Sequence, residues 1–597
     1  AKATYGRKGD AIVQMNYDAI DAGAKQVVEV QVPESWKDCA DEGLFMAHAE
    51  GGRTDVVDFV NNIQAKVNAQ EGNTLPVSAF KDYVDGTTPS GSSAFEKRGI
   101  AVDIPVWQPE NCIQCNRCAY VCPHAVIRPV AMTDAEVAAA PEGMRTLPMT
   151  GMADYKFVMT VSAYDCTGCG SCANVCPGKK GAKALVMANM EANAGEQKFF
   201  DYGVTLPVKE DVIAKFKENT VKGSQFKQPL LEFSGACAGC GETPYAKLIT
   251  QLFGDRMYIA NATGCSSIWG NSSPSTPYTV NAKGQGPAWS NSLFEDNAEF
   301  GYGMLLAQKA IRGGLKTKVE SVMASENASE EVKAACQEWL DTYNSGVTNG
   351  AATDKLVAAL EGCDCDVCKD IVNNKDFLAK KSQWIFGGDG WAYDIGFGGV
   401  DHVLASGQDI NVMVFDTEVY SNTGGQSSKS TPTGAIAQFA AGGKEVKKKD
   451  MASIAMSYGY VYVAQIAMGA DFNQTVKAIA EAEAYPGPSL IIAYAPCINH
   501  GIKKGMSKAQ TEEELAVKCG YWHNFRFNPA AENKFSLDSK APSEEGYQEF
   551  LNGEVRYNSL QRSNPEKAAR LFAKNEAEAR ARYEYLNKLV TLYGKTE

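Results

Sequence analysis

The sequence predicts an α/β protein in which a large domain built on a parallel β-sheet follows a smaller α+β region and a short linker. The first observation is length, because 597 residues exceed what one hydrophobic core supports at about 150 residues per domain. The second is that, after residue 228, short apolar runs alternate with longer helical segments, as in parallel sheets. The third is an upstream segment that carries two runs of four cysteines.

The individual elements can be placed along the chain. The parallel sheet is expected to take its strands from residues 257–260, 384–386, 410–415, 460–466 and 490–494. A long helical excursion lies between residues 271 and 381, and a final helix begins at Pro565, behind an Asn cap. Upstream, residues 26–32 form a possible strand, 55–67 a helix, and 85–93 a turn-rich linker or extended arm.

These elements divide the chain into four parts. Residues 1–50 have the pattern of the tail of a preceding folded unit, and residues 51–105 that of a connecting region. Residues 106–210 carry the two cysteine runs, and residues 211–597 form the sheet domain. The chain begins without Met, apolar leader or cleavage site, so we expect it to be a piece of a longer polypeptide.

Charge and composition narrow the classes of partner. The formal net charge of −13 disfavours nucleic acid and anionic membrane surfaces. The sequence holds no apolar run of the length that a membrane span needs, about 18 residues. Eighteen cysteines without a secretory signal indicate a reducing, cytoplasmic compartment and metal or cluster ligation, not a disulfide framework.

The two cysteine runs share one spacing. Each has the pattern C-x2-C-x2-C-x3-C-P of bacterial two-cluster ferredoxins, in which the fourth cysteine of each run ligates the other cluster. This spacing assigns to one 4Fe–4S cluster the residues Cys112, Cys115, Cys118 and Cys176. It assigns to the second cluster the residues Cys122, Cys166, Cys169 and Cys172. Structural zinc is the alternative, but zinc sites usually pair two separated C-x2-C knuckles.

Four further cysteines lie in glycine-rich segments, two of them directly after candidate strands. They are Cys237, Cys240, Cys265 and Cys497. Ligands gather at the carboxyl ends of the strands of open α/β sheets, so these cysteines could close a third cluster. The alternative is that Cys265 and Cys497 are ordinary buried thiols.

Two of the expected strands run into loops that suit a diphosphate and its metal ion. The strand at 384–386 leads into Gly388-Asp389-Gly390, and the strand at 410–415 leads into Thr417, which lies 28 residues beyond Asp389. Octahedral Mg²⁺ takes carboxylate and other oxygen ligands, and small residues let backbone N–H groups approach a phosphate. This pair of loops is typical of thiamine diphosphate sites.

Taken together, these motifs resemble pyruvate:ferredoxin (flavodoxin) oxidoreductase over nearly the whole chain. The matching segments are the cysteine runs, Gly-Ala-Cys-Ala-Gly-Cys-Gly-Glu, Gly-Gly-Asp-Gly-Trp-Ala-Tyr-Asp-Ile-Gly and Asp-Thr-Glu-Val-Tyr-Ser-Asn-Thr-Gly-Gly-Gln. The resemblance implies the C-terminal half of the single-chain enzyme, with residues 1–50 ending a coenzyme A-binding-like domain. It also implies a two-cluster ferredoxin-like domain ahead of a thiamine-diphosphate-binding domain.

The resemblance assigns roles residue by residue. Metal-ion ligands would be Asp389, Thr417 and the carbonyl of Val419. Ligands of a proximal 4Fe–4S cluster would be Cys237, Cys240, Cys265 and Cys497. Cofactor contacts would be Glu242, Cys265, Gly388, Asp389, Gly390, Trp391, Thr417, Glu418, Val419, Tyr420, Ser421 and Asn422. Asn422 would also face the substrate and is the candidate catalytic residue.

The activity that the resemblance implies is oxidative decarboxylation of pyruvate to acetyl-CoA and CO2, as in a 2-oxo acid:ferredoxin oxidoreductase of the pyruvate synthase type. Its cofactors would be three 4Fe–4S clusters, thiamine diphosphate and Mg²⁺, with coenzyme A as co-substrate. Its partners would be ferredoxin or flavodoxin, the N-terminal half of the polypeptide and a second copy in a homodimer. The alternatives are 2-oxoglutarate or indolepyruvate as substrate, or an electron-transfer subunit without catalysis.

Two features stand outside this pattern. Cys363, Cys365 and Cys368 lie in the helical excursion, where a metal or redox role competes with ordinary surface thiols. A basic patch formed by Lys179, Lys180 and Lys183, with Arg117 nearby, is the expected docking site for an acidic electron acceptor. The competing basic run at 447–449 is expected to be a solvated loop.

Overall fold

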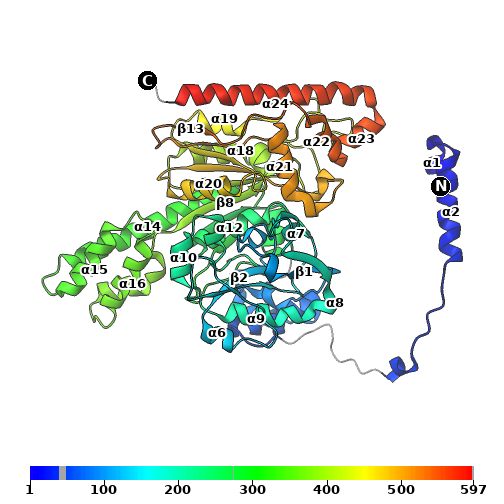
Figure 1. The fold of residues 1–597 in the computed structure, drawn as a ribbon. Helices are drawn as coiled ribbons and strands as arrows, with labels where there is room; N and C mark the ends of the chain where they lie inside the picture. The colour runs from blue at the N-terminus through cyan, green and yellow to red at the C-terminus, as the bar shows by residue number, and fades with distance from the viewer. Residues whose placement is uncertain (39–48, 273–274, 595–597) are drawn as a thin grey trace.

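The computed structural model describes residues 1–38, 49–272 and 275–594. Two bodies dominate it, a cysteine-rich α+β domain and a sheet domain stacked on it, with helices α14 to α17 projecting to one side (Figure 1). The predicted fold class is confirmed. No helix among the described residues is long and apolar enough to cross a membrane.

The sheet domain is built on eight strands in the order β13-β12-β10-β11-β9-β8-β6-β7. The strands are β6 (Met257–Ala262), β7 (Ala288–Ser292), β8 (Ser382–Gly388), β9 (Asn411–Asp416), β10 (Tyr462–Ile466), β11 (Ser489–Tyr494), β12 (Phe525–Phe527) and β13 (Phe535–Leu537). The six from β10 to β7 are parallel, and β12 and β13 add an antiparallel edge. Every residue of β9 and β11 is buried, because helices cover both faces.

The five predicted strands are confirmed, and each strand begins and ends within two residues of its predicted position. The sequence analysis missed β7, β12 and β13. On one face the core packs under α14 (Asn297–Met323), α18 (Phe397–Ala405), α19 (Met451–Met456) and α24 (Pro565–Tyr593). On the other face it packs under α12 (Thr243–Phe253) and α20 (Phe472–Ala484). The remaining helices of this domain are α13 (Cys265–Ser267), α15 (Glu330–Asp341), α16 (Asn349–Leu360), α17 (Asp366–Asn373), α21 (Ala509–Cys519), α22 (Tyr547–Gly553) and α23 (Val555–Ser563).

The cysteine-rich domain combines two small antiparallel sheets with short helices. Its strands are β1 (Asp103–Trp107), β2 (Ile127–Met132), β3 (Leu147–Pro148), β4 (Lys156–Val161) and β5 (Leu185–Asn189), paired as β1-β5 and β2-β4-β3. Its helices are α5 (Arg117–Tyr120), α6 (Asp134–Ala138), α7 (Ser171–Val175), α8 (Met190–Asn193), α9 (Gln197–Thr205), α10 (Glu210–Phe216) and α11 (Val221–Ser224). One apolar core runs through it from Ala101 to Phe233.

The first hundred residues contain one wrong prediction. Residues 26–33 form neither strand nor helix, and Val27, Val28 and Val30 are more than three-quarters exposed. A strand needs a neighbour for its backbone groups, and none of the described strands pairs with this segment. Helices α1 (Lys2–Tyr5) and α2 (Asp10–Lys25) stand apart from the two bodies (Figure 1).

The helix predicted at 55–67 is confirmed as α3 (Thr54–Phe59), a π-helical stretch (Val60–Gln64) and α4 (Ala65–Asn68). The turn-rich segment after it docks as an arm. Ser92 and Ser93 are fully buried, and the Ser93 hydroxyl donates to the Glu232 carbonyl at 3.0 Å. Thr276 donates its backbone N–H to the Ser92 hydroxyl at 2.9 Å. The arm therefore contacts both the cysteine-rich domain and the sheet domain.

Candidate functional site

Four loops that carry predicted site residues emerge from four adjacent parallel strands. In the order β11-β9-β8-β6, these strands lead into Cys497, Thr417, Asp389 and Cys265. Parallel strands end at one edge of the sheet, so their loops meet there. The sheet order therefore brings together residues that are up to 232 positions apart in the sequence (Cys265 and Cys497).

The candidate metal site lies between the loops after β8 and β9. The Thr417 hydroxyl is 3.0 Å from Asp389 Oδ1 and 3.0 Å from the Val419 carbonyl oxygen. Adjacent ligands of an octahedral Mg²⁺, each about 2.1 Å from the ion, are about 3.0 Å apart. Glu418 has φ of 62°, in the left-handed region, and this turn carries the Val419 carbonyl back towards Thr417. The distances from Thr417 to the other two predicted ligands thus match the spacing around such an ion.

Asp389 is fully buried and held by hydroxyl groups. Ser428 and Ser430 donate to Asp389 Oδ2 at 2.7 and 2.9 Å, and the Thr417 N–H donates to Oδ1 at 3.1 Å. Burial raises the pKa of Asp389 to about 7, and the charge of Asp416 adds to the rise. A divalent cation would offset this cost, so the donor set fits Mg²⁺. Both serines were missed from the sequence, although they follow the Thr-Gly-Gly segment closely.

A buried charge network supports the loop after β9. Lys448 Nζ lies 2.8 Å from an Asp416 oxygen and 2.9 Å from a Glu418 oxygen, and Arg556 lies 2.8 Å from Glu418. Burial alone would raise the pKa of Glu418, but Lys448 and Arg556 outweigh it and lower that pKa to about 2. The carboxylate of Glu418, a predicted cofactor contact, binds these two cations.

The network also corrects the prediction of a solvated loop at 447–449. Lys447 is exposed, but the ammonium groups of Lys448 and Lys449 are turned inwards. Lys449 donates to the Tyr393 carbonyl at 3.1 Å, and Tyr393 donates its hydroxyl to Asp416 at 2.8 Å. For Lys448 the reason is the two buried carboxylates of Asp416 and Glu418, which need a cationic partner that the local sequence pattern does not reveal.

In the glycine loop after β8, the backbone packs closely against the rings of neighbouring aromatic side chains. A Cβ atom at Gly390 would lie 2.6 Å from the Tyr420 ring, and one at Gly387 would lie 2.3 Å from the Trp391 ring. Trp391 is 1% exposed and packs in the core. Gly388 is half-buried at the end of β8.

Next to the metal site, the four dispersed cysteines line one cavity. Those cysteines are Cys237, Cys240, Cys265 and Cys497. The same cavity is lined by Glu242, Thr417 and Asn422, which belong to the candidate thiamine site. Ser421 places its hydroxyl 3.1 Å from Cys265 Sγ. Burial raises the pKa of Cys240, Cys265 and Cys497.

Glu242 is a buried carboxyl group at this cavity. It is 4% exposed, and burial raises its pKa to about 7 while a hydrogen bond from Trp269 Nε1, at 2.7 Å, opposes the rise. The group can therefore hold or release a proton near neutral pH, beside the place where the cofactor would react.

The two cysteine runs are brought together in the crossed pattern that their spacing predicts. One cavity is lined by Cys112, Cys115, Cys118 and Cys176. A second is lined by Cys122, Cys166, Cys169 and Cys172. The fourth cysteine of each run thus joins the first three of the other, and both groups could hold a cubane cluster.

Two residues that the sequence analysis missed link the cysteine-rich domain to the sheet domain. His124 binds the Ala236 carbonyl through Nε2 at 2.9 Å, and burial lowers its pKa to about 4. Lys247, 1% exposed, donates Nζ to the carbonyls of Ala119 and Tyr120, the latter at 3.0 Å. Among the described residues Lys247 is the only fully buried lysine, and no local motif marks it.

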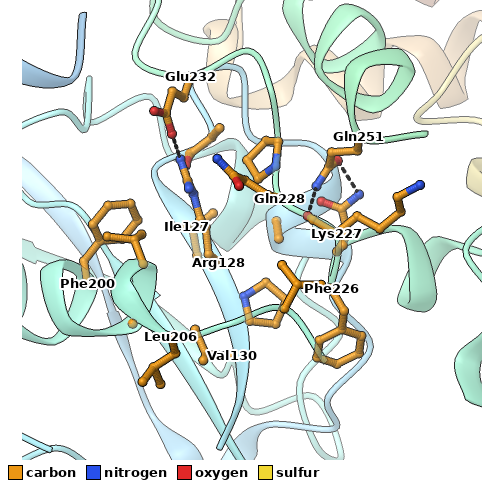
Figure 2. Close-up of a pocket in the computed structure, with 18 of the residues that line it drawn as sticks. Ile127, Arg128, Val130, Phe200, Leu206, Phe226, Lys227, Gln228, Glu232 and Gln251 are labelled. Atoms are coloured by element: carbon orange, nitrogen blue, oxygen red, sulfur yellow. Dashed lines mark hydrogen bonds and ion pairs between the residues drawn. The ribbon is translucent and has the colours of Figure 1, made fainter. Parts of the chain in front are cut away.

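A further cavity of about 250 Å³ lies at the junction of the two bodies, away from all these loops. Figure 2 shows Arg128 paired with Glu232 on one wall and Gln251 bound to the Lys227 carbonyl on another. None of its described lining residues is a predicted site residue.

Three protein families match parts of the chain. Residues 374–493 match "Thiamine pyrophosphate enzyme, C-terminal TPP binding domain", and residues 111–180 match "4Fe-4S dicluster domain". Residues 48–101 match a domain of unknown function named EKR. The first two matches cover the metal loops and the two cysteine runs, so the predicted thiamine-diphosphate-binding and two-cluster domains are present.

Similar proteins extend the match to almost the whole chain. Pyruvate-flavodoxin oxidoreductase of Enterobacter agglomerans is 54% identical over 98% of this chain and 50% of its own length. The pyruvate-flavodoxin oxidoreductase of Klebsiella pneumoniae is 53% identical over 98% of this chain and 49% of its own length. Pyruvate:ferredoxin oxidoreductase of Moorella thermoacetica is 54% identical over 98% of this chain and 50% of its own length. The chain spans about half the length of the curated relatives it matches, and over that half it is similar to pyruvate-flavodoxin and pyruvate:ferredoxin oxidoreductases.

Proposed function

We propose that this chain carries the diphosphate site and the electron path of an enzyme that oxidises pyruvate to acetyl-CoA and CO2 and reduces ferredoxin or flavodoxin. The observation that carries the proposal is the shared cavity, where Cys240, Cys265 and Cys497 lie with Glu242 and Asn422. A pure electron carrier needs no diphosphate site, and a thiamine enzyme without iron needs no cysteines there.

Each group of residues has a defined task in this proposal. Thiamine diphosphate supplies the electron sink for loss of CO2 when it is bound. Asp389, Thr417 and the Val419 carbonyl hold Mg²⁺, which neutralises the diphosphate. Glu242 holds a proton at the buried side of the cavity, and Asn422, exposed at its mouth, orients the 2-oxo acid. Cys237, Cys240, Cys265 and Cys497 bind the proximal cluster.

The domain contacts support an order for the clusters. Gly239, between two proximal cysteines, hydrogen-bonds through its backbone to Cys169 of the second run. Helix α7, which contains Cys172, packs against α21 of the sheet domain. We therefore place the cluster of Cys122, Cys166, Cys169 and Cys172 in the middle of the path. The cluster of Cys112, Cys115, Cys118 and Cys176 is then the exit cluster.

The acceptor docks, in this proposal, over the exit cluster. Lys179 and Lys180 lie in a tight exposed turn, closed by the Lys179 N–H bound to the Ala182 carbonyl at 3.1 Å. Lys183 is exposed, but its ammonium group is anchored by the carbonyls of Asn174 and Cys176 at 2.9 and 2.6 Å. We therefore centre the docking patch on Lys179 and Lys180.

A substrate comparison tests the proposal. The full-length assembly, as a homodimer with the upstream half, is assayed for coenzyme A-dependent reduction of ferredoxin with pyruvate, 2-oxoglutarate and indolepyruvate. We expect pyruvate to give by far the highest kcat/KM, and preference for another 2-oxo acid would refute the assignment. Asn422→Ala, which leaves cluster and metal ligands intact, should lower kcat with pyruvate while iron content is unchanged. The cytoplasmic location remains a prediction.

A further inference from the structure

A group of three thiols outside the proposed path lies in the helical excursion, at the turn between α16 and α17. The Sγ atoms of Cys363, Cys365 and Cys368 all lie within 4.8 Å of one another. The proposed clusters use twelve other cysteines, and the relation to known domains assigns nothing to these three.

The backbone creates this convergence. Helix α16 ends at Leu360, whose carbonyl accepts from the Cys363 N–H at 3.1 Å, and Gly362 has φ of 88°, which lets the chain reverse. Cys365 is the N-cap of α17, and its sulfur accepts from the Cys368 N–H at 3.2 Å. Turn, cap and first helical turn therefore point three sulfur atoms at one place.

The convergence of three sulfur atoms suits a thiolate-bound metal ion better than it suits a disulfide. A tetrahedral Zn²⁺ has Zn–S bonds of about 2.3 Å, which puts its sulfur ligands about 3.8 Å apart. Cys365 Sγ and Cys368 Sγ are 2.7 Å apart, between the ~2.05 Å of a disulfide bond and the spacing of zinc-bound sulfur atoms, so this one distance favours neither. A disulfide would use two of the three thiols, whereas a metal ion uses all three.

A metal ion can reach the site from solvent through the two more exposed thiols, and the buried third thiol anchors it. Cys365 is exposed and Cys363 is half-buried, so the sulfur atoms are reached from solvent. Cys368 is 3% exposed and packs with Ile371 in the core of the helical excursion. Asp364, fully exposed, pairs with Lys369 at 3.3 Å, so the fourth coordination position is open to this carboxylate or to water.

We propose that Cys363, Cys365 and Cys368 bind one thiophilic d¹⁰ metal ion, with Zn²⁺ as the best fit, separate from the iron clusters. Three S–H groups release their protons to solvent as three Zn–S bonds form, and no electrons are exchanged. The ion joins the end of α16 to the start of α17. A 4Fe–4S cluster is a poor fit, because the C-x-C-x2-C segment offers three cysteines and no fourth nearby in sequence.

The test measures zinc and iron together on the complete polypeptide, purified without oxygen and equilibrated with ZnCl₂. We expect one zinc ion per chain, with sulfur scatterers at about 2.3 Å at the zinc absorption edge, which iron does not obscure. Cys365→Ser should lower zinc affinity roughly 10-fold or more, with iron content unchanged. Serine is a favoured N-cap, so this variant keeps the start of α17.

The matched control is Cys336→Ala, a buried thiol of the same helical excursion that lies outside the group. It should keep the zinc. Equal zinc in the parent and Cys365→Ser, or a zinc edge without sulfur neighbours, would overturn the proposal. A Cys365–Cys368 disulfide in the zinc-equilibrated protein, found by alkylation and mass spectrometry, would overturn it in favour of a redox pair.

Discussion

Asp389 shows how a single residue can be found from sequence while its environment cannot. Its loop and its distance from Thr417 in sequence mark both as oxygen ligands, and the two side chains meet at 3.0 Å. Ser428, which fixes the other carboxylate oxygen, belongs to no recognisable spacing, because its role depends on how a later loop folds back. Local motifs reveal the ligand residues. The residues that hold those ligands in place are brought there by tertiary contacts, which a local motif does not show.

Replacement of Asp389 by Asn should abolish Mg²⁺-dependent binding of thiamine diphosphate, with a loss of more than about 100-fold in affinity. The amide keeps the shape but removes the charge that balances the ion. Isothermal titration on the assembled enzyme measures the effect, and cluster absorbance serves as control because it should persist. Binding at the parent's affinity would contradict the assignment of Asp389.

Binding of the cofactor should also depend on pH through Asp389. Burial raises its pKa from 3.8 to about 7, so the cation-free folded protein keeps a proton that the unfolded chain has lost. Stability without the cation then falls as the pH rises from about 4 to about 7. Mg²⁺ must displace this proton, so thiamine diphosphate affinity should fall below about pH 7, by up to ~10-fold per pH unit. A flat affinity profile across that range would exclude this coupling.

Lys247 adds a prediction that no sequence motif suggested. Its ammonium group donates to the carbonyls of Ala119 and Tyr120, which stand in sequence between Cys118 and Cys122, members of different clusters in our assignment. Lys247→Met should make both cluster potentials more negative, since a cation that favours the reduced state is lost. Two buried carbonyls lose their donor, at a cost of about 1–3 kcal/mol in stability.

Redox titration followed by electron paramagnetic resonance measures the potentials of this variant. Lys227→Met is the matched control, because Lys227 pairs with Glu218 at 2.8 Å on the wall of the junction cavity. Unchanged potentials in Lys247→Met would show that its charge does not reach the clusters.

Elements were predictable where a strand is buried on both faces. Continuous apolar runs marked β9 and β11. The edge strands were missed because β12 and β13 have three residues each and β7 is polar. The apolar run at 26–32 was wrongly taken for a strand, since pattern alone does not show whether a partner strand exists.

At the scale of elements, the proximal cluster depends on loops from separate strands, and Cys497 alone follows β11. Cys497→Ala should lower iron content from about twelve to about eight per chain, because one of three cubanes is lost. Iron and sulfide analysis measures this, and thiamine diphosphate binding should persist because Asp389 and Thr417 are untouched. Unchanged iron would refute the ligand set.

At the scale of the whole molecule, an acidic chain of net charge −13 needs a local basic surface to meet an acidic acceptor. Lys179→Glu with Lys180→Glu should slow ferredoxin reduction about 10-fold or more at low ionic strength, mainly through association. Reduction of a small neutral dye should be nearly unchanged. Stopped-flow kinetics at several salt concentrations measures the effect, and Lys447→Glu is the control on a distant exposed loop. Equal rates for variant and parent would show that these lysines only solubilise the turn.

The contacts of Lys247 and His124 with the opposite domain have a consequence for how charge moves. Some electron-transfer proteins use a tethered carrier that swings between donor and acceptor, and their turnover slows as the solvent becomes more viscous. Here buried bonds join the two bodies beside the cysteines themselves, and Tyr120 adds a hydrogen bond to the Phe472 carbonyl at 3.1 Å. Internal transfer should therefore proceed by tunnelling across fixed gaps, and glycerol should slow only the encounter with the external acceptor.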